Sequence, residues 1–240
     1  MKNILLLSTL QEDTLNALKT ALAQAEDQPL TIVLMLLHET PNDVSAAFWL
    51  RKMQSNFTPF EESILAQCQQ MASFHPNCKL RIQQQFSLSG PLLRHLMETF
   101  EIGLIIVPQS FLKSTKSQNK YCLQLLKKGH TPILQLPAEL EESRFSKALY
   151  LENEESNVPV ADLPKMAGGH FSFRIISQAK IFDLNNQQEM TPVYNTIHKN
   201  GIDLLIETRK PKKIRTSQKN KPALNDHFGL PVLSVCESAY

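Results

Sequence analysis

The sequence predicts an α/β fold built from two tandem units, each with a parallel β-sheet covered by helices on both faces. Short, almost wholly apolar segments alternate with amphipathic helical segments, and the same order returns in shortened form in the second half. The chain has 240 residues, of which 42% are hydrophobic and 20% charged, as in ordinary globular proteins. No apolar run approaches the ~18 residues of a membrane span, so no membrane partner is expected.

The first unit is predicted to contain five strands. Most of them are continuously apolar, as strands of a sheet covered on both faces are. One alternates polar and apolar residues at its start, which is typical of an edge strand with one exposed face. In chain order, the predicted strands are Asn3–Leu7, Leu30–Leu37, Lys79–Phe86 (the edge strand), Leu104–Val107 and Pro132–Leu136.

Helices are predicted between these strands. We expect Asp13 to cap the first helix, whose leucines recur at helical spacing. Thr58-Pro59-Phe60-Glu61 is a capping box with proline at the first helical position, and it predicts a long helix to about Phe74. Further helices are predicted at Val44–Gln54, at Leu92–Phe100 and in the segment that ends at Gly129.

The second half repeats the first. "KALYL" at Lys147–Leu151 matches "NILLL" at an offset of 144 (147 − 3), and "IDLLIE" at Ile202–Glu207 matches "IGLIIV" at 100 (202 − 102). The fall in offset predicts that the second unit lacks the helices of Val44–Phe74. We expect its second strand at His170–Ser177 and a helix opened by Thr191-Pro192. The domains are predicted at residues 1–140 and 145–240.

These patterns resemble the universal stress protein family in its tandem form. The resemblance rests on "NILLLSTLQEDTLNALKTALAQA", on Ser89-Gly90-Pro91, and on "IGLIIV" followed by "KKGHTPILQL". It implies two Rossmann-like domains with parallel five-stranded sheets, the second truncated, and a role in the cytoplasmic stress response. It also implies that Pro132–Leu136 pairs with Pro231–Val235 within the chain, and it leaves a homodimer open.

The nucleotide-binding branch of that family carries an Asp after the first strand, and G-x-x-G followed by G-[S/T] after the fourth. This sequence departs from each element, because proline lacks an N–H donor and phenylalanine fills space that glycine leaves open. ATP and AMP are therefore disfavoured, and no cofactor is expected. In the second unit the equivalent positions are Asn153, Thr208, Pro211, Gln218 and Lys219. The degenerate crevice of the first unit is predicted to contain Thr9, His38, Pro108, Ser110, Asn119 and Lys120.

A basic segment, "RKPKKIRTSQKNK", occupies the phosphate-loop position of the second unit. A solvated loop is the favoured interpretation, and a small-anion site is the main alternative. Nucleic acid is disfavoured, because aromatic residues are absent from the segment and the net charge of the chain is only +2. The candidate anion-binding residues are Lys210, Lys212, Lys213, Arg215 and Lys219.

Catalytic and metal motifs are missing from the sequence. The seven histidines show no H-x-x-x-H spacing, the four cysteines form no C-x-x-C pair, and there is no G-x-S-x-G. The favoured function is a non-enzymatic binding or scaffold module with an unidentified protein partner. One rival is a protein that binds a nucleotide or phosphate ligand through Lys113, Lys120 or the basic segment. A nucleotide hydrolase, with Glu12, Asp13 and Glu207 as the nearby carboxylates, is the least favoured.

Overall fold

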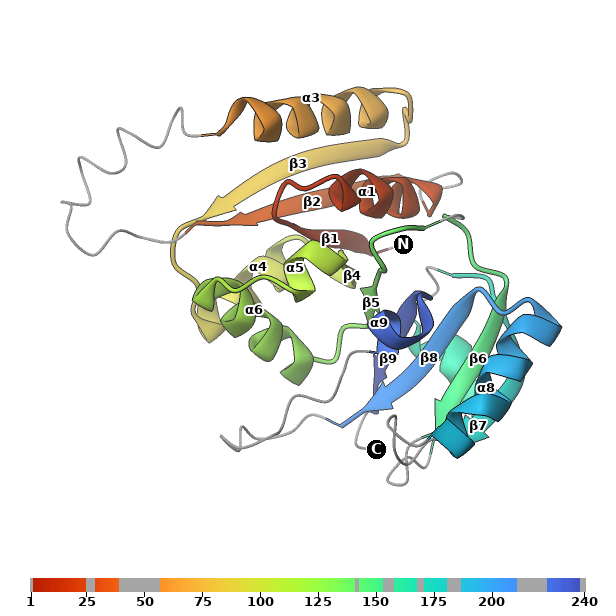
Figure 1. The fold of residues 1–240 in the computed structure, drawn as a ribbon. Coiled ribbons are helices and arrows are strands. Elements are labelled where there is room, and N and C mark those ends of the chain that lie inside the picture. Colours follow the sequence, from red (N-terminus) through yellow and green to blue (C-terminus); the bar gives the residue numbers. More distant parts are fainter. Residues whose placement is uncertain are drawn as a thin grey trace.

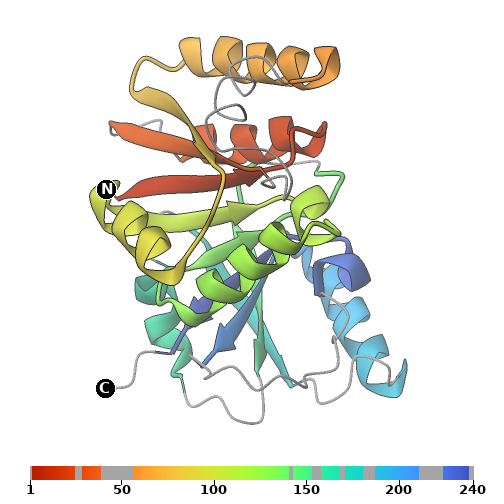
Figure 2. The same cartoon turned by 90° about the vertical axis from the view of Figure 1, so that its left-hand side faces the viewer.

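The computed structural model describes residues 2–24, 29–38, 57–140, 143–152, 158–167, 171–180, 187–210 and 224–237. In the range 187–210, side chains are described from residue 190 onward. These residues form one nine-stranded sheet, seen in Figure 1 and, after a quarter turn, in Figure 2. The strand order is β3-β2-β1-β4-β5-β9-β8-β6-β7, so each half of the chain supplies one side of the sheet. None of the described helices is long and apolar enough to cross a membrane.

The first half contains the five parallel strands that the sequence predicts. Strands β2 and β4 lie on opposite sides of β1, so the order in which strands are added reverses at β1. In open α/β sheets, ligands bind at such a reversal, outside the carboxyl ends of the two strands, and we call this place beside β1 and β4 the crevice. The strands are β1 (Asn3–Ser8), β2 (Leu30–Leu37), β3 (Cys78–Gln85), β4 (Ile102–Val107) and β5 (Ile133–Gln135).

Helices cover both faces of this half. On one face Ile4 and Leu6 of β1 pack with α1 (Asp13–Ala23) and α3 (Pro59–Ser73), and on the other Leu5 and Leu7 pack with the remaining helices. Thr58 and Glu61 form the predicted capping box of α3. The helices of the second face are α4 (Gly90–Thr99), α5 (Gln109–Leu112) and α6 (Ser117–Lys128).

The second half is a shortened copy. Its order β9-β8-β6-β7 matches β5-β4-β1-β2, and among the described residues no element corresponds to α3 or β3. Within the described part of the chain, the second half thus lacks an edge strand as well as a helix equivalent to α3. The elements are β6 (Lys147–Glu152), η2 (Val160–Asp162), α7 (Leu163–Met166), β7 (Arg174–Lys180), α8 (Gln187–Asn200), β8 (Leu204–Arg209), α9 (Leu224–Phe228) and β9 (Val232–Cys236).

Two boundaries in the second half differ from the sequence prediction. Strand β7 begins at Arg174, four residues after the expected start at His170. Helix α8 begins at Gln187 and contains Pro192, which the sequence predicts at the first turn. Met190, in the part of the helix that precedes Thr191, is buried, and this burial favours the earlier start. The predicted helix at Val44–Gln54 lies outside the described residues.

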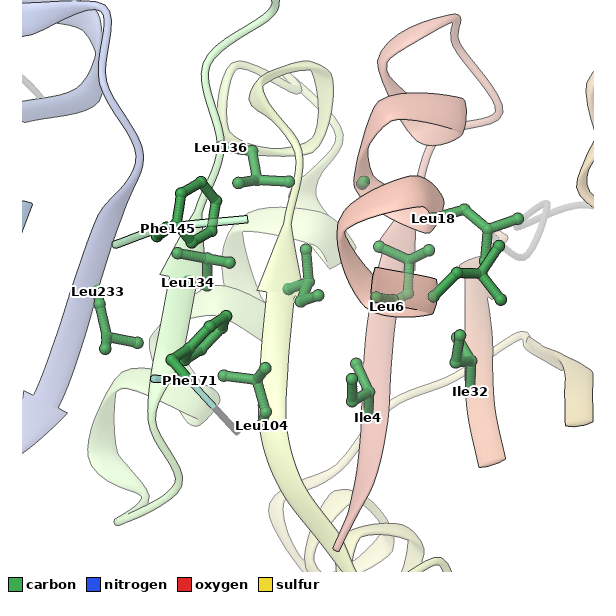
Figure 3. Packing of buried hydrophobic residues seen from close by; sticks show 14 of the residues in the cluster. Ile4, Leu6, Leu18, Ile32, Leu104, Leu134, Leu136, Phe145, Phe171 and Leu233 are labelled. Carbon is green, nitrogen blue, oxygen red and sulfur yellow. The ribbon is translucent and has the colours of Figure 1, made fainter. Parts of the chain in front are cut away.

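The two halves meet where β5 pairs with β9. The pairing is antiparallel and matches Ile133–Gln135 with Val232–Ser234, inside the two segments named from the sequence. One apolar cluster continues across this junction, as Figure 3 shows for Leu134 and Leu136 beside Leu233 and Phe145. The halves are therefore joined by backbone hydrogen bonds and by a shared core.

Candidate functional site

The crevice of the first half begins where β1 ends. Ser8 Oγ accepts a hydrogen bond from the Leu10 backbone N–H at 2.8 Å and lies 2.8 Å from Thr14 Oγ1. Leu10 has a φ of +55°, a left-handed conformation that leucine rarely adopts. The chain thus turns sharply after β1 and leads directly into α1. Thr9, where the family carries an aspartate, faces the loop that follows β4.

That loop forms a short helix in place of an open phosphate cradle. The Pro108 carbonyl accepts hydrogen bonds from the backbone N–H groups of Phe111 and Leu112, at 3.1 and 3.2 Å, which closes the first turn of α5. Phe111 is fully buried in the apolar cluster under α4–α6. The two residues at the expected glycine positions therefore bind the loop to the core. Phe111 points into the protein, and it does not cover the crevice from outside.

Asp13 closes the crevice with its carboxylate. It accepts hydrogen bonds from the Ser110 backbone N–H at 2.7 Å and from Ser110 Oγ at 2.8 Å. Thr9 Oγ1 lies 2.7 Å from the same hydroxyl. A carboxylate is favourable here, because it satisfies an N–H group in the first turn of α5.

The predicted role of Asp13 as a cap of α1 is wrong. Glu12 is the N-cap residue, it makes no side-chain cap hydrogen bond, and Asp13 is the first residue of the helix. Its side chain instead reaches Ser110, 97 residues further along the chain. Local spacing carries no signal for a contact over such a separation.

A second carboxylate reaches the loop from the other half. Asp226 of α9 accepts a hydrogen bond from Gln109 Nε2 and forms an ion pair with Lys113 at 3.1 Å. Both charged side chains are partly exposed, so the ion pair contributes little stability. The ion pair bears on ligand binding instead, because Lys113, one of the lysines considered for phosphate binding, is already paired with a carboxylate.

Asn119 and Lys120, at the expected Gly-Ser positions, point in different directions at the start of α6. Asn119 is buried, and its Nδ2 donates to Ser114 Oγ at 2.8 Å, whereas Lys120 is exposed. The preceding residue, Gln118, donates from Nε2 to the Phe86 carbonyl at 3.2 Å. Asn119 Oδ1 and Gln118 Oε1 are buried and have no hydrogen-bond partner among the residues that the structure describes.

His38 lies beside this group, after the end of β2. Its ring stacks on Phe86, with centroids 5.0 Å apart, and lies 6.1 Å from the Phe57 ring. Burial lowers the pKa of His38, and the charge of Lys116 lowers it further, against the opposing effect of Glu61. The imidazole is thus neutral at pH 7 and cannot serve as a cation for phosphate. Its Nε2 is a third buried atom in this region that no described residue bonds to.

In the second half, one of the five candidate anion-binding residues lies in the described part of the chain. Lys210 is exposed, and Lys212, Lys213, Arg215 and Lys219 lie outside it, as does Asn153. The sequence did not single out Arg209 from its neighbours. Its guanidinium donates to the carbonyls of Ser234, Gly129 and Thr131, so it joins β8 and β9 to the first half.

Glu207 lies two residues before Arg209 on β8. Burial raises the pKa of its carboxyl group. The hydrogen bond from Ser234 and the charges of Lys127 and Arg209 oppose that rise. Glu207 therefore belongs to the junction of the two halves, and it does not face the loop after β4.

The described residues provide no metal centre or activated thiol. They contain no group of three His, Cys, Asp or Glu side chains that could hold a metal ion. Burial raises the pKa of Cys122 to about 12 and those of Cys68 and Cys78 to about 11, so these thiols are protonated at pH 7.

An open hollow of about 600 Å³ lies away from the crevice. It is found at the amino ends of β1, β4 and β5 and is lined by Lys2, Glu101, Ile102, Gly103, His130, Thr131, Pro132 and Met166. These residues lie at the opposite end of the first-half strands from Thr9 and Ser110. The hollow therefore does not contain the predicted site.

Comparison with known proteins gives likeness of fold. No family model matches the chain, and no curated protein matches it. A universal stress protein from Archaeoglobus fulgidus DSM 4304 is 9% identical, with a TM-score of 0.54 over 99% of this chain and 97% of that one. A functionally unknown protein from Pseudomonas aeruginosa PAO1 is 10% identical, with a TM-score of 0.49 over 98% and 92%. A universal stress protein family member from Burkholderia pseudomallei is 14% identical, with a TM-score of 0.39 over 56% and 95%. The two-unit architecture and the likeness to the Archaeoglobus fulgidus protein together show that the chain has the fold of the universal stress proteins.

Proposed function

We propose that this chain is a non-enzymatic binding or regulatory module of the cytoplasmic stress response that does not bind ATP in the manner of its fold family. The observation that carries the proposal is the Asp13 carboxylate, which occupies the Ser110 N–H and hydroxyl at 2.7 and 2.8 Å. A phosphate group entering the loop after β4 would meet this negative charge. It would also have to displace Asp13 before it could reach the Ser110 donors.

The rest of the loop supports the same conclusion. Asp226 places a second carboxylate beside the loop, at Gln109 and Lys113. Like charges repel at short range, and the repulsion is strongest where water is excluded. Pro108 offers no N–H group, and Phe111 anchors the loop in the core. A protein partner, recognised by the outer surface, is therefore the proposed mode of action.

A second candidate function is the binding of a small phosphorylated or polar ligand beside α6. It is favoured by the buried, unpartnered atoms His38 Nε2, Gln118 Oε1 and Asn119 Oδ1, because such atoms cost free energy unless something bonds to them. Exposed Lys120 would supply the charge for a phosphate group. For a nucleotide hydrolase, the structure offers less support, since Asp13 is engaged by Ser110 and Glu207 lies at the junction of the halves.

Thermal unfolding with millimolar Mg-ATP, AMP or inorganic phosphate tests both functions. A ligand at 100 times its Kd stabilises a protein by roughly 2.7 kcal/mol, which shifts the midpoint by several degrees. We expect no shift with any of the three. A shift with ATP and AMP that phosphate does not reproduce would overturn the proposal. If Lys120→Gln abolishes that shift and the matched variant Lys128→Gln keeps it, the second candidate is correct.

A further inference from the structure

Helix α6 presents a basic face to the outside of the molecule, next to α5 (Figure 1). Its exposed residues recur at helical spacing, whereas Asn119, Cys122 and Leu126 between them are buried. The face is about 16 Å long at 1.5 Å per residue, and it contains no carboxylate. Its members, which we call the α6 face, are Lys116, Ser117, Lys120, Tyr121, Gln124 and Lys127.

The lysines of the α6 face are not neutralised by the described part of the chain. Three other lysines there, at positions 113, 165 and 180, form ion pairs with carboxylates. Lys116, Lys120 and Lys127 form none with any described residue. Lys116 and Lys120 are four residues apart on the helix, where like charges repel. The face therefore holds uncompensated positive charge that a bound anion would neutralise.

The basic segment after β8 is attached to the protein beside both ends of α6. Where the segment begins, Arg209 donates to the carbonyls of Gly129 and Thr131, just after the end of α6. Beyond its other end, Asp226 of α9 forms an ion pair with Lys113, shortly before α6 begins. Two stretches that are far apart in the sequence therefore meet at this helix.

These two stretches carry about half of the positive charge of the chain. Residues 109–131 and 209–223 contain 12 of the 25 Lys and Arg residues and none of the 23 Asp and Glu residues. The rest of the chain has 13 basic residues (25 − 12) and all 23 acidic ones. The net charge of +2 thus combines a strongly positive region with a negative remainder. With so uneven a distribution, a small net charge does not argue against a polyanionic partner.

Tyr121 indicates which polyanion suits the α6 face. Its side chain is 42% exposed and lies on the same face as the lysines. Proteins bind single-stranded nucleic acid with cationic side chains along the backbone and with aromatic rings on which unpaired bases stack. A duplex keeps its bases stacked on each other, and an acidic peptide has no base to place on the ring. The aromatic residue that the basic segment lacks is therefore present on the neighbouring helix.

An anionic membrane surface fits the α6 face less well. Helices that lie on a membrane insert large apolar side chains between the lipids. The leucines of α6 are not available for this, because Leu123, Leu125 and Leu126 pack against the apolar cluster under α4–α6. The exposed part of the helix is left with polar and basic residues and one tyrosine.

We propose that single-stranded nucleic acid binds along the α6 face, with phosphate groups at the lysines and a base stacked on Tyr121. Stacking uses the flat face that every base has, so little sequence preference is expected. The phosphate and base chemistry is common to RNA and DNA. This ligand is additional to the protein partner proposed above. It does not depend on the crevice, to which Lys116, Tyr121 and Lys127 do not belong.

Fluorescence anisotropy of a labelled oligouridylate, and of an oligothymidylate of the same length, titrated with the full chain tests the proposal. We expect reversible binding that weakens between about 50 and 200 mM salt, because binding releases counterions from the phosphates. Lys116→Gln combined with Lys127→Gln should weaken binding at 50 mM salt at least about tenfold and make its salt dependence less steep. The matched control, Lys19→Gln with Lys79→Gln, removes two exposed lysines from α1 and β3 and should bind as the unmodified chain does.

Tyr121→Ala gives a second readout, which does not change the charge. Loss of the ring should weaken binding at least about fivefold, whereas Tyr121→Phe keeps the ring and should bind as the unmodified chain does. A duplex of the same length should bind more weakly than either single strand. The better bound of the two single strands identifies RNA or DNA as the preferred ligand.

The proposal is overturned if neither single strand binds at 50 mM salt. It is also overturned if the two double-lysine variants weaken binding equally, since the charge on α6 would then have no special role. Full binding by Tyr121→Ala, together with displacement by polyglutamate, would mean that the face recognises charge alone and serves an acidic protein. Thermal unfolding with ATP probes the crevice separately, so the two proposals can fail independently.

Discussion

The two halves use the ends of their equivalent strands, β4 and β8, in different ways. In the first half, the chain turns into α5 after β4, buries Phe111 and presents Ser110 to Asp13. In the second half, β8 continues to Arg209, whose guanidinium reaches carbonyl groups of the first half. The same position in the repeat thus closes a crevice in one unit and fastens the two units together in the other. The two equivalent strand ends therefore make different structural contacts.

The two halves also differ two residues earlier, near the ends of β4 and β8. Glu207 corresponds to Val107 at the repeat offset of 100 (207 − 107), and Val107 is fully buried and apolar. The first half therefore ends its strand with a side chain that belongs to a core. The second half places a carboxyl group there, close to Arg209 and Ser234. At this position of the repeat, the second half thus carries a polar side chain and the first half an apolar one.

Phe111→Ala tests the apolar side of this comparison and should have the largest effect. Removing a fully buried phenylalanine leaves a cavity, and we expect the free energy of unfolding to fall by about 3–5 kcal/mol. Urea titration followed by circular dichroism measures it. Phe74→Ala, at a side chain that is 73% exposed, is the control and should change the free energy by less than about 0.5 kcal/mol. Equal effects in the two variants would contradict the role of Phe111.

Arg209→Met tests the polar side and should have an intermediate effect. The substitution keeps an aliphatic stem but removes the donors to Ser234, Gly129 and Thr131, and hydrogen bonds from a charged group are worth about 1.5–3 kcal/mol. We expect a loss of about 2 kcal/mol by urea titration. Lys210→Met, which removes the same charge from the exposed neighbouring residue, should leave stability nearly unchanged. A Lys210 variant as unstable as the Arg209 variant would show that net charge, and not the junction, is responsible.

The fold could be predicted from the sequence because its signals are local or periodic. Apolar runs such as Leu30–Leu37 and the capping box at Thr58 each indicate one element without reference to the rest of the chain. The repeat offsets added the order of the second half. The missing counterpart of β3 was less visible, because a shortened offset gives the number of residues lost and does not say which element they formed.

The site could be predicted only in part. Substituted motif positions such as Pro108 and Phe111 are visible in a sequence, and they predict a loop that departs from the family's pattern. The groups that fill the space are not visible, because Asp13 and Asp226 come from elements 97 and 117 residues away from their partners, Ser110 and Gln109. Contacts of this kind depend on how the sheet brings separate loops together. No spacing rule within one segment encodes them.

Glu207→Gln sharpens the comparison through pH and should have the smallest effect. Burial raises the pKa of Glu207 above its ordinary value of 4.5 in the folded state, so the folded chain holds this proton more tightly than the unfolded chain does. The stabilisation is complete below the ordinary value and is lost as the pH rises through the folded pKa. Glutamine resembles the protonated form and has no such dependence. The free-energy difference between variant and unmodified chain should therefore grow in favour of the variant from pH 4 to pH 8, to about 1 kcal/mol.

Urea titrations at several pH values measure it, with Glu98→Gln, on the exposed side of α4, as the control. A difference that does not change with pH would mean that the Ser234 hydrogen bond and the charges of Lys127 and Arg209 cancel the effect of burial, so that the pKa of Glu207 is the same in the folded and unfolded chain. A free-energy difference that grows with pH shows instead that the carboxyl group of Glu207 destabilises the second half at neutral pH. The first half has no such cost, because Val107 stands at the equivalent position.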